Sequence, residues 1–425
     1  MKGFAGNRAA MKILWVKAGG LVPPDTGGKI RSYNILRELA RKHSVTLFSF
    51  YAAHSDDRHP ALNAVFDKAV CLPLEMSAPK SRKEFVNYLR YVFSLHSYSA
   101  MKFCRPQVRT ALEALLAEQK FDVIVCDFLF AAPVIPWNRP GLKVLFTHNV
   151  EAMIWRRHYE VSRNPLWKAL AWREWKTMER AERSYLRKAD HVLAVSETDA
   201  NVFAEFLPSS KITVIPTGVD TEFFQPVPHA EAPNTLVFTG SMDWLPNEDG
   251  IFYFAEKILP KIHQRVPDAR LCVVGRKPSR RLQELSRRQN YITITGWVED
   301  VRPYLSQGAL CIVPLRIGGG TRLKIFEAMA MEKAVVSTTI GAEGLPVENR
   351  KNVLIADGEE NFARACVELL GNAALRNQIG TEGRRMVCAK YSWAKIADAF
   401  TESLQCVRSR AHLADGPVPS SSESS

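Results

Sequence analysis

The chain has 425 residues, enough for two or three domains of ordinary size. Hydrophobic residues make up 46% and charged residues 24%, a composition that is typical of globular proteins and excludes a disordered, collagen-like or coiled-coil chain. The 57 Lys and Arg residues outnumber the 44 Asp and Glu residues, which leaves a formal net charge of +13. This excess favours an anionic partner such as a phosphate, a nucleic acid or an acidic lipid head group.

The cysteines and the start of the chain indicate a cytoplasmic protein. The eight cysteines include no CxxC pair and several lie in apolar runs, which predicts reduced thiols and neither a disulfide framework nor a zinc site. Residues 1–10 lack the apolar stretch of a signal peptide, and Met11 precedes a clearer strand pattern than Met1. Because the chain has no uninterrupted run of about 18 apolar residues, no transmembrane helix is expected.

Strand and helix patterns alternate from residue 11 onward. A buried strand at 12–16, a helical pattern at 30–40 and a second strand at 45–50 make up a βαβ unit. Ser196 is expected to cap a later helix, with Asp199 at its third position. Further strands of this first series are expected at 123–126, 144–146, 191–195 and 212–215.

A second series of strands and helices follows an interruption at 232–234. Repeated alternation implies parallel sheets with helices on both faces, so the two series predict two doubly wound α/β domains. Ligands of such sheets bind beyond the carboxyl ends of the strands. The strands expected in the second series are 236–238, 271–274, 292–294, 310–313, 334–337 and 353–355.

The most informative motif is IGGGTRLKIFEAMA at 317–330, where three glycines lie between an expected strand and an expected helix. Glycines allow a ligand to approach the backbone, and the free N–H groups of a helix start favour an anion. Arg322 and Lys324 oppose the helix dipole, which a bound polyphosphate would explain, and Glu327 could bind two sugar hydroxyls. The alternative is a structural turn with solvated cations. The motif matches neither GxxxxGK[ST] nor GxGxxG.

The segment 318–345, which contains this motif, resembles the donor-site signature of family 4 glycosyltransferases. That family has the GT-B fold, in which two Rossmann-like domains face a cleft. The C-terminal domain binds a nucleotide-diphosphate sugar and the N-terminal domain binds most of the acceptor. The resemblance spans residues 11–405, because four more stretches agree in order and spacing: TGGKIRSYNILRELARKHSV (26–45), VIPTGVDTEFF (214–224), FTGSMDWLPNEDGIFYFAEKILPKI (238–262) and ITITGWVEDVRPYLSQGALCIVPL (292–315).

The resemblance implies how the chain divides. An extension at 1–10 precedes the N-terminal acceptor domain at 11–217, which a C-terminal helix at 391–412 crosses back to complete. The nucleotide-sugar domain comprises residues 218–390, and the two domains are expected to close around the donor. The Ser- and Pro-rich residues 413–425 are expected to be disordered.

The resemblance also implies roles for candidate site residues. His148 follows an expected strand at its carboxyl end, where the family places a histidine near the donor sugar; the alternative is a core histidine. With Arg322 and Lys324, which would stabilise the leaving diphosphate, it completes the candidate catalytic set. Asp127 and Glu151 could each be functional or serve as ordinary turn or capping residues. The donor is expected to contact Gly27, Gly28, Gly319, Gly320, Thr321 and Glu327.

Two places depart from the family pattern. Gly319 stands where many members have the first of two glutamates, so backbone amides of the loop are expected to contact the donor sugar instead. A common Arg/Lys pair in the first loop of the second domain is replaced by residues 241–244 and Asn247. We therefore expect Arg322 and Lys324 to carry the interaction with the diphosphate, without a metal ion or another cofactor.

Two segments combine cations with aromatic and aliphatic side chains. Residues 79–103 interleave Arg and Lys with Phe, Tyr and Leu, and residues 163–188 carry eight Lys or Arg against three Glu, with three Trp. Both could lie on an anionic membrane beside a lipid-linked acceptor; the alternative is a pair of helices with one core face and one solvated face. Because no nucleic-acid-binding module is visible, nucleic acid is not expected as a partner.

The resemblance predicts a retaining, metal-independent glycosyltransferase that moves a sugar from a nucleotide-diphosphate donor to a glycan or glycolipid acceptor. The setting we expect is cell-surface or exopolysaccharide synthesis at the inner face of the cytoplasmic membrane. A nucleotide-sugar epimerase of the same fold is a second hypothesis, and the missing glutamate at position 319 argues against it. A catalytically inactive glycan-binding or scaffold protein is a third, and the presence of Arg322, Lys324 and Glu327 argues against that.

Overall fold

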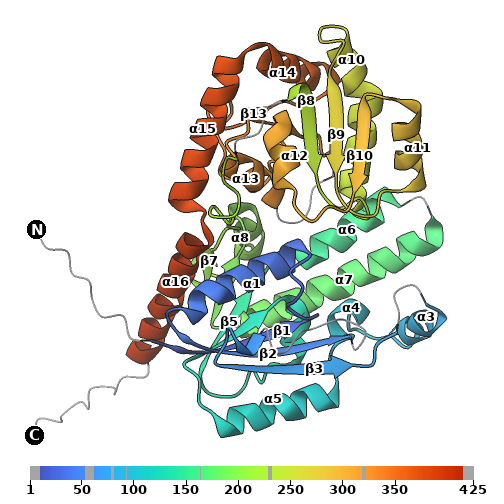
Figure 1. Cartoon of the computed structure of the whole chain (residues 1–425). Coiled ribbons are helices and arrows are strands. Elements are labelled where there is room, and N and C mark those ends of the chain that lie inside the picture. Colours follow the sequence, from blue (N-terminus) through green and yellow to red (C-terminus); the bar gives the residue numbers. More distant parts are fainter. Residues whose placement is uncertain are drawn as a thin grey trace, which may run out of the picture. The chain divides into compact units, whose positions relative to one another are not determined.

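The computed structural model describes residues 10–52, 62–77, 81–91, 93–162, 164–227, 232–317 and 322–414. The chain divides into two compact units, each built on one parallel sheet flanked by helices (Figure 1). Met1–Pro216 and Ala397–Ser425 make up the first unit, and Thr217–Ile396 makes up the second.

The first unit contains a seven-stranded parallel sheet in the order β3-β2-β1-β4-β5-β6-β7. The register places Lys17 opposite Asp127, and Asp127 opposite Phe146. The central strands are buried almost throughout, as expected of a sheet covered on both faces. The strands are β1 (Lys12–Ala18), β2 (Ser44–Ala52), β3 (Lys68–Leu74), β4 (Val123–Asp127), β5 (Leu142–Phe146), β6 (His191–Ala194) and β7 (Ile212–Val214).

Helices from both ends of the chain pack on this sheet. The last helix, α16, belongs to the first unit from Ala397 onward, and its Phe400 ring lies 5.4 Å from Trp15 and 5.3 Å from Phe146. The helices of this unit are α1 (Gly27–Ala40), α3 (Arg82–Leu89), α4 (Tyr98–Met101), α5 (Pro106–Glu118), η1 (Leu129–Val134), α6 (Glu151–Val161), α7 (Pro165–Lys188), α8 (Glu197–Ala204), η2 (Ser209–Lys211) and α16 (Trp393–Ala414).

The end of α16 corrects one expectation. Residues 413 and 414, expected to begin a disordered tail, are the last turn of the helix. Leu413 and Ala414 both have high helix propensity, which favours the helical conformation found at these two positions. The expectations for residues 1–9 and 415–425 fall outside the described residues.

The second unit contains a six-stranded parallel sheet in the order β10-β9-β8-β11-β12-β13. Its strands are β8 (Ala232–Thr239), β9 (Arg270–Val274), β10 (Ile292–Gly296), β11 (Gly308–Val313), β12 (Val335–Ser337) and β13 (Leu354–Ile355). Its helices are α9 (Leu245–Tyr253), the π-helical turn η3 (Phe254–Ile258), α10 (Leu259–His263), α11 (Arg280–Arg288), α12 (Arg302–Gln307), α13 (Leu323–Ala330), α14 (Glu359–Gly371) and α15 (Ala373–Lys390).

The two sheets share one topology, which decides where a ligand can bind. In each, the first strand pairs with the second strand on one side and the fourth on the other. The chain therefore winds in opposite directions from β1 and from β8, and in sheets of this topology ligands bind at the carboxyl ends of the two diverging strands, here β1 and β4, and β8 and β11. The prediction of two doubly wound parallel sheets is confirmed, and Ser196 caps α8 through the backbone N–H of Asp199 (3.1 Å), as predicted.

One strand was missing from the predicted set. β3 has the sequence KAVCLPL, and Pro73 removes one backbone donor from a run that would otherwise indicate a strand. β3 is the edge strand of the first sheet, and an edge strand tolerates proline because one of its sides makes no ladder hydrogen bonds.

Candidate active site

At the carboxyl end of the first sheet, a buried histidine pairs with a buried aspartate. His148 lies two residues beyond β5, Asp127 ends β4, and His148 Nε2 lies 2.8 Å from Asp127 Oδ1. Both side chains are inaccessible to solvent. The structure thus brings the predicted catalytic histidine together with the aspartate whose role was left open.

The second oxygen of Asp127 is also fully engaged. Its Oδ2 accepts hydrogen bonds from Trp15 Nε1 (2.8 Å) and Lys17 Nζ (3.0 Å). Lys17 also donates to the hydroxyl of Ser32 (3.0 Å), which donates to the carbonyl of Gly28 (2.9 Å). Burial alone would raise the pKa of Asp127, but the charges of Lys17 and His148 hold it well below its usual range. Asp127 is therefore an ionised carboxylate inside the protein.

The imidazole of His148 is held by aromatic rings and stays neutral. It stacks on Phe128 with centroids 4.1 Å apart and an interplanar angle of 8°, and Phe146 meets it edge-on at 4.7 Å. Burial lowers the pKa of His148 to about 4, although Asp127 opposes the shift. Phe128 has φ 73°, an uncommon backbone conformation for a bulky residue, which commits the chain to this stacked arrangement.

Gly28, a predicted donor contact, lies against this histidine. A Cβ atom at position 28 would lie 2.9 Å from Phe128 Cε2 and 3.8 Å from His148 Nδ1, so only glycine lets the start of α1 approach so closely. Arg31, one turn further along α1, donates to the carbonyls of Thr147 (2.8 Å) and Ile215 and so ties down the segment that carries His148. Gly27 is the first residue of α1.

Two buried glutamates lie beyond the histidine. Glu182 of α7 accepts the backbone N–H of Glu151 (2.9 Å) and so caps the start of α6. Burial raises the pKa of Glu151 to about 7 and that of Glu182 to about 8. A small cavity lined by His148, Glu151 and Glu182 lies between them. Glu151 is therefore the capped residue, and the capping Glu182 was not among the predicted site residues.

In the second unit, Arg322 is held by the segment after β12. Arg322 directly precedes α13 and is 5% exposed. Its guanidinium group donates to the carbonyl of Ile340 (3.1 Å) and lies 3.5 Å from the carboxylate of Glu343. Of the predicted donor contacts in this motif, Gly319, Gly320 and Thr321 lie outside the described residues.

Lys324 projects from the first turn of α13 toward the carboxyl end of β8. Its Nζ donates to Asn247 Oδ1 (2.7 Å) and lies 3.9 Å from the centre of the Phe238 ring. Burial lowers the pKa of Lys324 to about 7, with Arg322 adding to the shift, and burial raises the pKa of Glu327 to about 7. These strongly shifted groups share one helix end, the pattern expected of a ligand site.

Two cations from the neighbouring strand end contact the residues that stand in place of the family's Arg/Lys pair. Ser241 Oγ accepts a hydrogen bond from Arg276 Nε (3.0 Å), and Asp243 pairs with Lys277 (3.1 Å). Arg276 and Lys277 follow β9 at its carboxyl end, so cations from the neighbouring strand reach the place where the pair is absent. Their position after a strand is the same signal that singled out His148, and it was overlooked.

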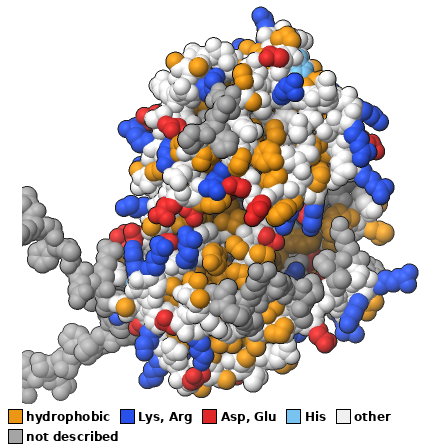
Figure 2. Space-filling view, viewed as in Figure 1, with side chains coloured by type: hydrophobic (Ala, Val, Ile, Leu, Met, Phe, Trp, Pro, Cys, Tyr) orange, Lys and Arg blue, Asp and Glu red, His pale blue; other side chains and the backbone are white. Residues whose placement is uncertain are grey.

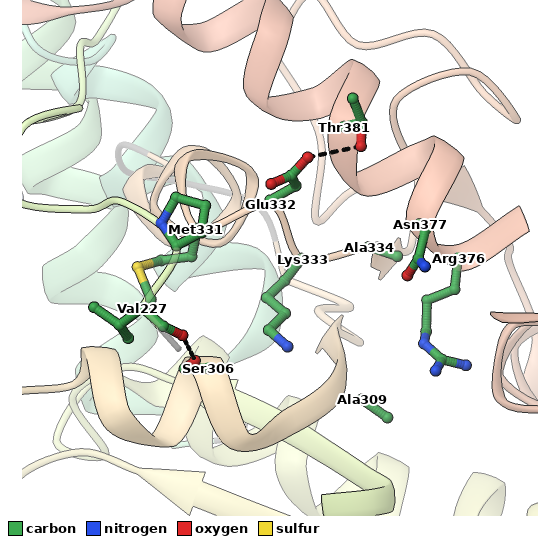
Figure 3. Close-up of a pocket in the computed structure, with 11 residues that line it drawn as sticks. Val227, Ser306, Ala309, Met331, Glu332, Lys333, Ala334, Arg376, Asn377 and Thr381 are labelled. Atoms are coloured by element: carbon green, nitrogen blue, oxygen red, sulfur yellow. Dashed lines mark hydrogen bonds between the residues drawn. The ribbon is translucent and has the colours of Figure 1, made fainter. Parts of the chain in front are cut away.

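Another pocket lies at the amino ends of the strands of the second sheet, opposite the carboxyl ends described above (Figure 3). It has a volume of about 380 Å³ and is lined by Lys333, Arg376, Asn377 and Thr381, among others. Ala309 and Ala334, which also line it, lie at the amino ends of β11 and β12. Because parallel sheets bind ligands at their carboxyl ends, we do not place the candidate site there.

Two family models match nearly consecutive parts of the chain. The model of glycosyltransferase family 4 matches residues 26–223, and the model of glycosyl transferases group 1 matches residues 233–372. By sequence, the chain is 22% identical over 310 residues to an uncharacterised 44.6 kDa protein in the cps region of Klebsiella pneumoniae. The aligned residues cover 70% of this chain and 78% of that protein.

The chain is also 28% identical over 249 residues to the GDP-mannose-dependent α-(1-6)-phosphatidylinositol monomannoside mannosyltransferase of Mycobacterium tuberculosis. This alignment covers 51% of this chain and 64% of that protein. Among solved structures, the sucrose-phosphate synthase of Thermosynechococcus elongatus has a TM-score of 0.70 at 18% identity and covers 94% of this chain and 99% of its own. The Anabaena protein HepE, solved with UDP and glucose, has a TM-score of 0.66 at 13% identity and covers 93% and 99%. These structures share the fold.

Proposed function

The chain belongs to the family 4 glycosyltransferases, and we propose that it transfers a sugar from a nucleotide-diphosphate donor to a hydroxyl of a glycan or lipid-linked acceptor, with retention of configuration. The donor assignment rests on the contacts at the amino-terminal end of α13. There Lys324, Asn247 and Gly240 meet beside the carboxyl end of β8. Gly240 has no side chain at a point where a Cβ would lie 2.7 Å from Lys324 Nζ. The absence of a side chain at Gly240 therefore lets Lys324 and Asn247 pack against the end of β8, and a phosphate bound at the start of α13 would meet the ammonium group there.

In this proposal, protein cations neutralise the diphosphate without a metal ion. Lys324 and the start of α13 would contact it directly, and Arg276 and Lys277 would add positive charge from the neighbouring strand end. Arg322 would hold the segment after β12 in place through Ile340 while adding its own charge. Stabilising the leaving diphosphate is the main catalytic requirement, because charge develops on its oxygens as the glycosidic bond breaks.

Glu327 would bind the ribose of the donor. It lies one turn along α13 from Lys324, and a carboxylate with two oxygens suits a pair of vicinal hydroxyls. Because burial raises the pKa of Glu327 to about 7, two hydroxyl donors would favour its ionised form on binding.

A panel of nucleotide sugars tests the reaction and separates it from the alternatives. The mycobacterial relative uses GDP-mannose and HepE was solved with UDP and glucose, so UDP-glucose and GDP-mannose are the first donors to try. We expect one of them to release its nucleoside diphosphate only when an acceptor is present, and the sugar to appear in product with its anomeric configuration kept. Epimerised free donor would support an epimerase, and binding without turnover would support an inactive scaffold.

We also propose that one surface of the first unit contacts an anionic membrane. Exposed apolar side chains gather on α3, on the loop that follows it and at the start of α7, with Phe93 98% and Leu166 83% exposed. Figure 2 shows cationic and apolar side chains intermixed at its right-hand edge, where Figure 1 places α3 and α7. The apolar set is Val86, Leu89, Phe93, Leu95, Leu166, Trp167 and Trp172, and the exposed cations around it include Arg82, Lys83, Arg90 and Lys176.

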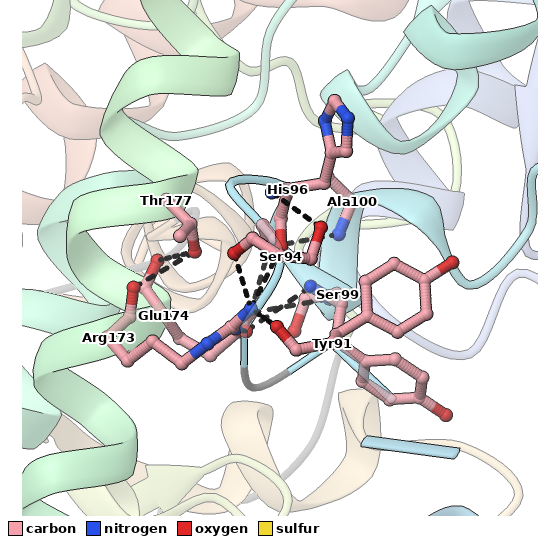
Figure 4. Close-up of polar contacts among 10 residues, drawn as sticks. Tyr91, Ser94, His96, Ser99, Ala100, Arg173, Glu174 and Thr177 are labelled. Carbon is pink, nitrogen blue, oxygen red and sulfur yellow. Dashed lines mark hydrogen bonds and ion pairs between the residues drawn. The ribbon is translucent and has the colours of Figure 1, made fainter. Parts of the chain in front are cut away.

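The apolar loop is anchored rather than loose (Figure 4). Arg173 of α7 donates to the carbonyls of Tyr91, Ser94 (3.0 Å) and His96 (3.2 Å). The fully buried Glu174 accepts from the Ser97 hydroxyl (2.8 Å) and from the first backbone N–H groups of α4. These contacts hold the loop with Phe93 exposed, and Phe93 forms part of a set of neighbouring exposed apolar side chains, a feature that marks interaction sites.

Vesicle binding tests the membrane proposal. No helix in the described part of the chain is long and apolar enough to cross a bilayer, so contact would be peripheral. We expect sedimentation with vesicles containing phosphatidylglycerol and not with phosphatidylcholine alone. Burying a side chain of this size contributes about 1.5–3 kcal/mol, so changing Phe93 and Leu95 together to Ser should weaken binding at least about tenfold. Trp297→Ser, at a 73% exposed residue of the second unit, is the control; equal binding by all three proteins would refute the proposal.

A further inference from the structure

We propose that Asp127, Lys17 and Ser32 fix His148 in the tautomer that carries its proton on Nε2, so that Nδ1 accepts a hydrogen bond from a substrate hydroxyl. Asp127, Lys17 and Ser32 are then positioning residues, because they act through His148. That the hydroxyl belongs to a sugar substrate rests on the proposed function; the tautomer itself does not.

The hydrogen bonds around Asp127 leave only one arrangement of protons. Trp15 Nε1 and Lys17 Nζ are obligate donors here, and both contact Oδ2. With a lysine ammonium at 3.0 Å, the carboxylate stays ionised and can only accept. The bond between Asp127 Oδ1 and His148 Nε2 must therefore be donated by the histidine. A carboxylate fixes the imidazole tautomer by the same logic in hydrolase triads.

The opposite ring nitrogen is left ready for a ligand. His148 Nδ1 is buried and has no hydrogen-bond partner among the residues that the structure describes. It lies close to the start of α1, since a Cβ atom on Gly28 would be 3.8 Å from it, and His148 also lines the small cavity that Glu151 and Glu182 share. A buried nitrogen without a partner costs free energy, and a hydroxyl that donates to it on binding removes that cost.

This arrangement makes His148 an orienting group and a poor general base. With its pKa lowered to about 4, the free imidazole binds a proton too weakly at neutral pH to abstract one efficiently. A neutral acceptor instead selects a hydroxyl and sets its direction. A fluorine atom in place of that hydroxyl could not donate, and would leave Nδ1 unsatisfied.

The tautomer can be measured without any substrate. Two-bond ¹H–¹⁵N spectra of protein labelled at histidine nitrogens report protonation of Nδ1 and Nε2 separately, and the His148 signal is the one lost in His148→Gln. At neutral pH we expect a proton on Nε2 and none on Nδ1. A proton on Nδ1, or on both nitrogens, would overturn the inference even if the variants below failed to fold.

Asp127→Asn supplies the functional test. The amide carbonyl would still accept from Lys17 and Trp15, which turns its NH₂ group toward His148 Nε2 and moves the ring proton to Nδ1. With UDP-glucose or GDP-mannose and their monofluorinated analogues, we expect wild type to bind the analogue fluorinated at the contacted position at least about tenfold more weakly than the parent sugar. The variant should lose most of that discrimination, because a protonated Nδ1 can donate to fluorine.

A second buried histidine provides the control. His191 is 4% exposed, has a pKa that burial lowers to about 4, and contacts the Thr213 hydroxyl at 2.8 Å rather than a carboxylate. His191→Gln should change neither the His148 signal nor the fluorine discrimination. Unchanged discrimination in Asp127→Asn, despite a moved proton, would refute the hydroxyl contact. Turnover of no nucleotide sugar, with the expected tautomer present, would refute the proposed function alone.

Discussion

The proposed donor site depends most on one side chain, Lys324. Its ammonium group lies over the Phe238 ring and contacts one amide oxygen, and burial lowers its pKa to about 7. Arg322 lowers the pKa further, and Glu327, whose own pKa burial raises to about 7, opposes the shift. A diphosphate would supply the counter-charge that Lys324 lacks in the free protein.

The affinity for a nucleoside diphosphate should therefore depend on pH. Binding favours the protonated Lys324, so affinity is highest below about pH 7 and falls by up to tenfold per unit above it, as each binding event must take up a proton. Ribose hydroxyls favour the ionised form of Glu327, so its titration acts in the opposite direction around pH 7; at about pH 8 this carboxyl is already mostly ionised, and the loss of affinity there reports Lys324. Calorimetry at about pH 8 in two buffers of different ionisation enthalpy measures the uptake. No uptake, or an affinity that rises with pH, would contradict the assignment.

Gly28 gives a second prediction at the scale of one residue. Gly28→Ala places a Cβ 2.9 Å from Phe128 Cε2, so the ring and the His148 stacked on it must shift. A displacement of about 1 Å in a catalytic group can cost about 100-fold, so we expect turnover to fall at least about tenfold while nucleoside diphosphate affinity is unchanged. Gly371→Ala, where a Cβ would meet nothing within 4 Å, is the control. Full turnover in Gly28→Ala would remove this glycine from the site.

At the scale of elements, periodicity predicted most of the strands, and tertiary context decided the rest. The buried runs of β1, β4 and β5 are apolar throughout, so they stand out from the sequence. The edge strand β3 was missed because tolerance of Pro73 depends on its neighbours in the sheet. The pairing of Lys17 with Asp127 joins residues 110 positions apart, which no local pattern reveals.

The same limit applied to the candidate site. His148 was predicted as a site residue because it follows a strand, and Lys324 and Glu327 were predicted because they belong to the Gly-rich motif at the start of a helix. Glu182 lies within a long helix, 24 residues from Pro165 to Lys188, where no strand end or glycine-rich turn marks it as a candidate. Its role as a cap for α6 depends on how α7 lies against that helix, which is known only from the structure.

Helix α16 carries the prediction at this scale. Phe400 packs between Trp15 and Phe146 in the core of the first unit, and losing a buried Phe costs about 3–5 kcal/mol. Phe400→Ala should lower Tm markedly, and a chain that ends at residue 392 should aggregate because that core is uncovered. A chain that ends at residue 414 should melt like wild type. Normal melting and solubility of the shorter chain would show that α16 is dispensable.

For the whole molecule, two sheets of the same topology present different chemistry at their carboxyl ends. The first sheet presents a neutral histidine beside a glycine, suited to hydroxyls, and the second presents cations beside glycines, suited to phosphates. A nucleotide sugar contains both kinds of group. The formal net charge of +13 favours anionic partners, as both the proposed donor site and the proposed membrane contact require.

The central claim is that the carboxyl end of the second sheet holds a nucleoside diphosphate through Lys324. Calorimetric titration of the protein with UDP and with GDP tests this claim most directly. A charge-assisted hydrogen bond contributes about 1.5–3 kcal/mol, so Lys324→Met should bind at least about tenfold more weakly than wild type. Lys351→Met, which removes an exposed lysine paired with Glu348, should bind like wild type. If neither nucleotide binds wild type, or if Lys324→Met binds as tightly, the donor site is not where we place it.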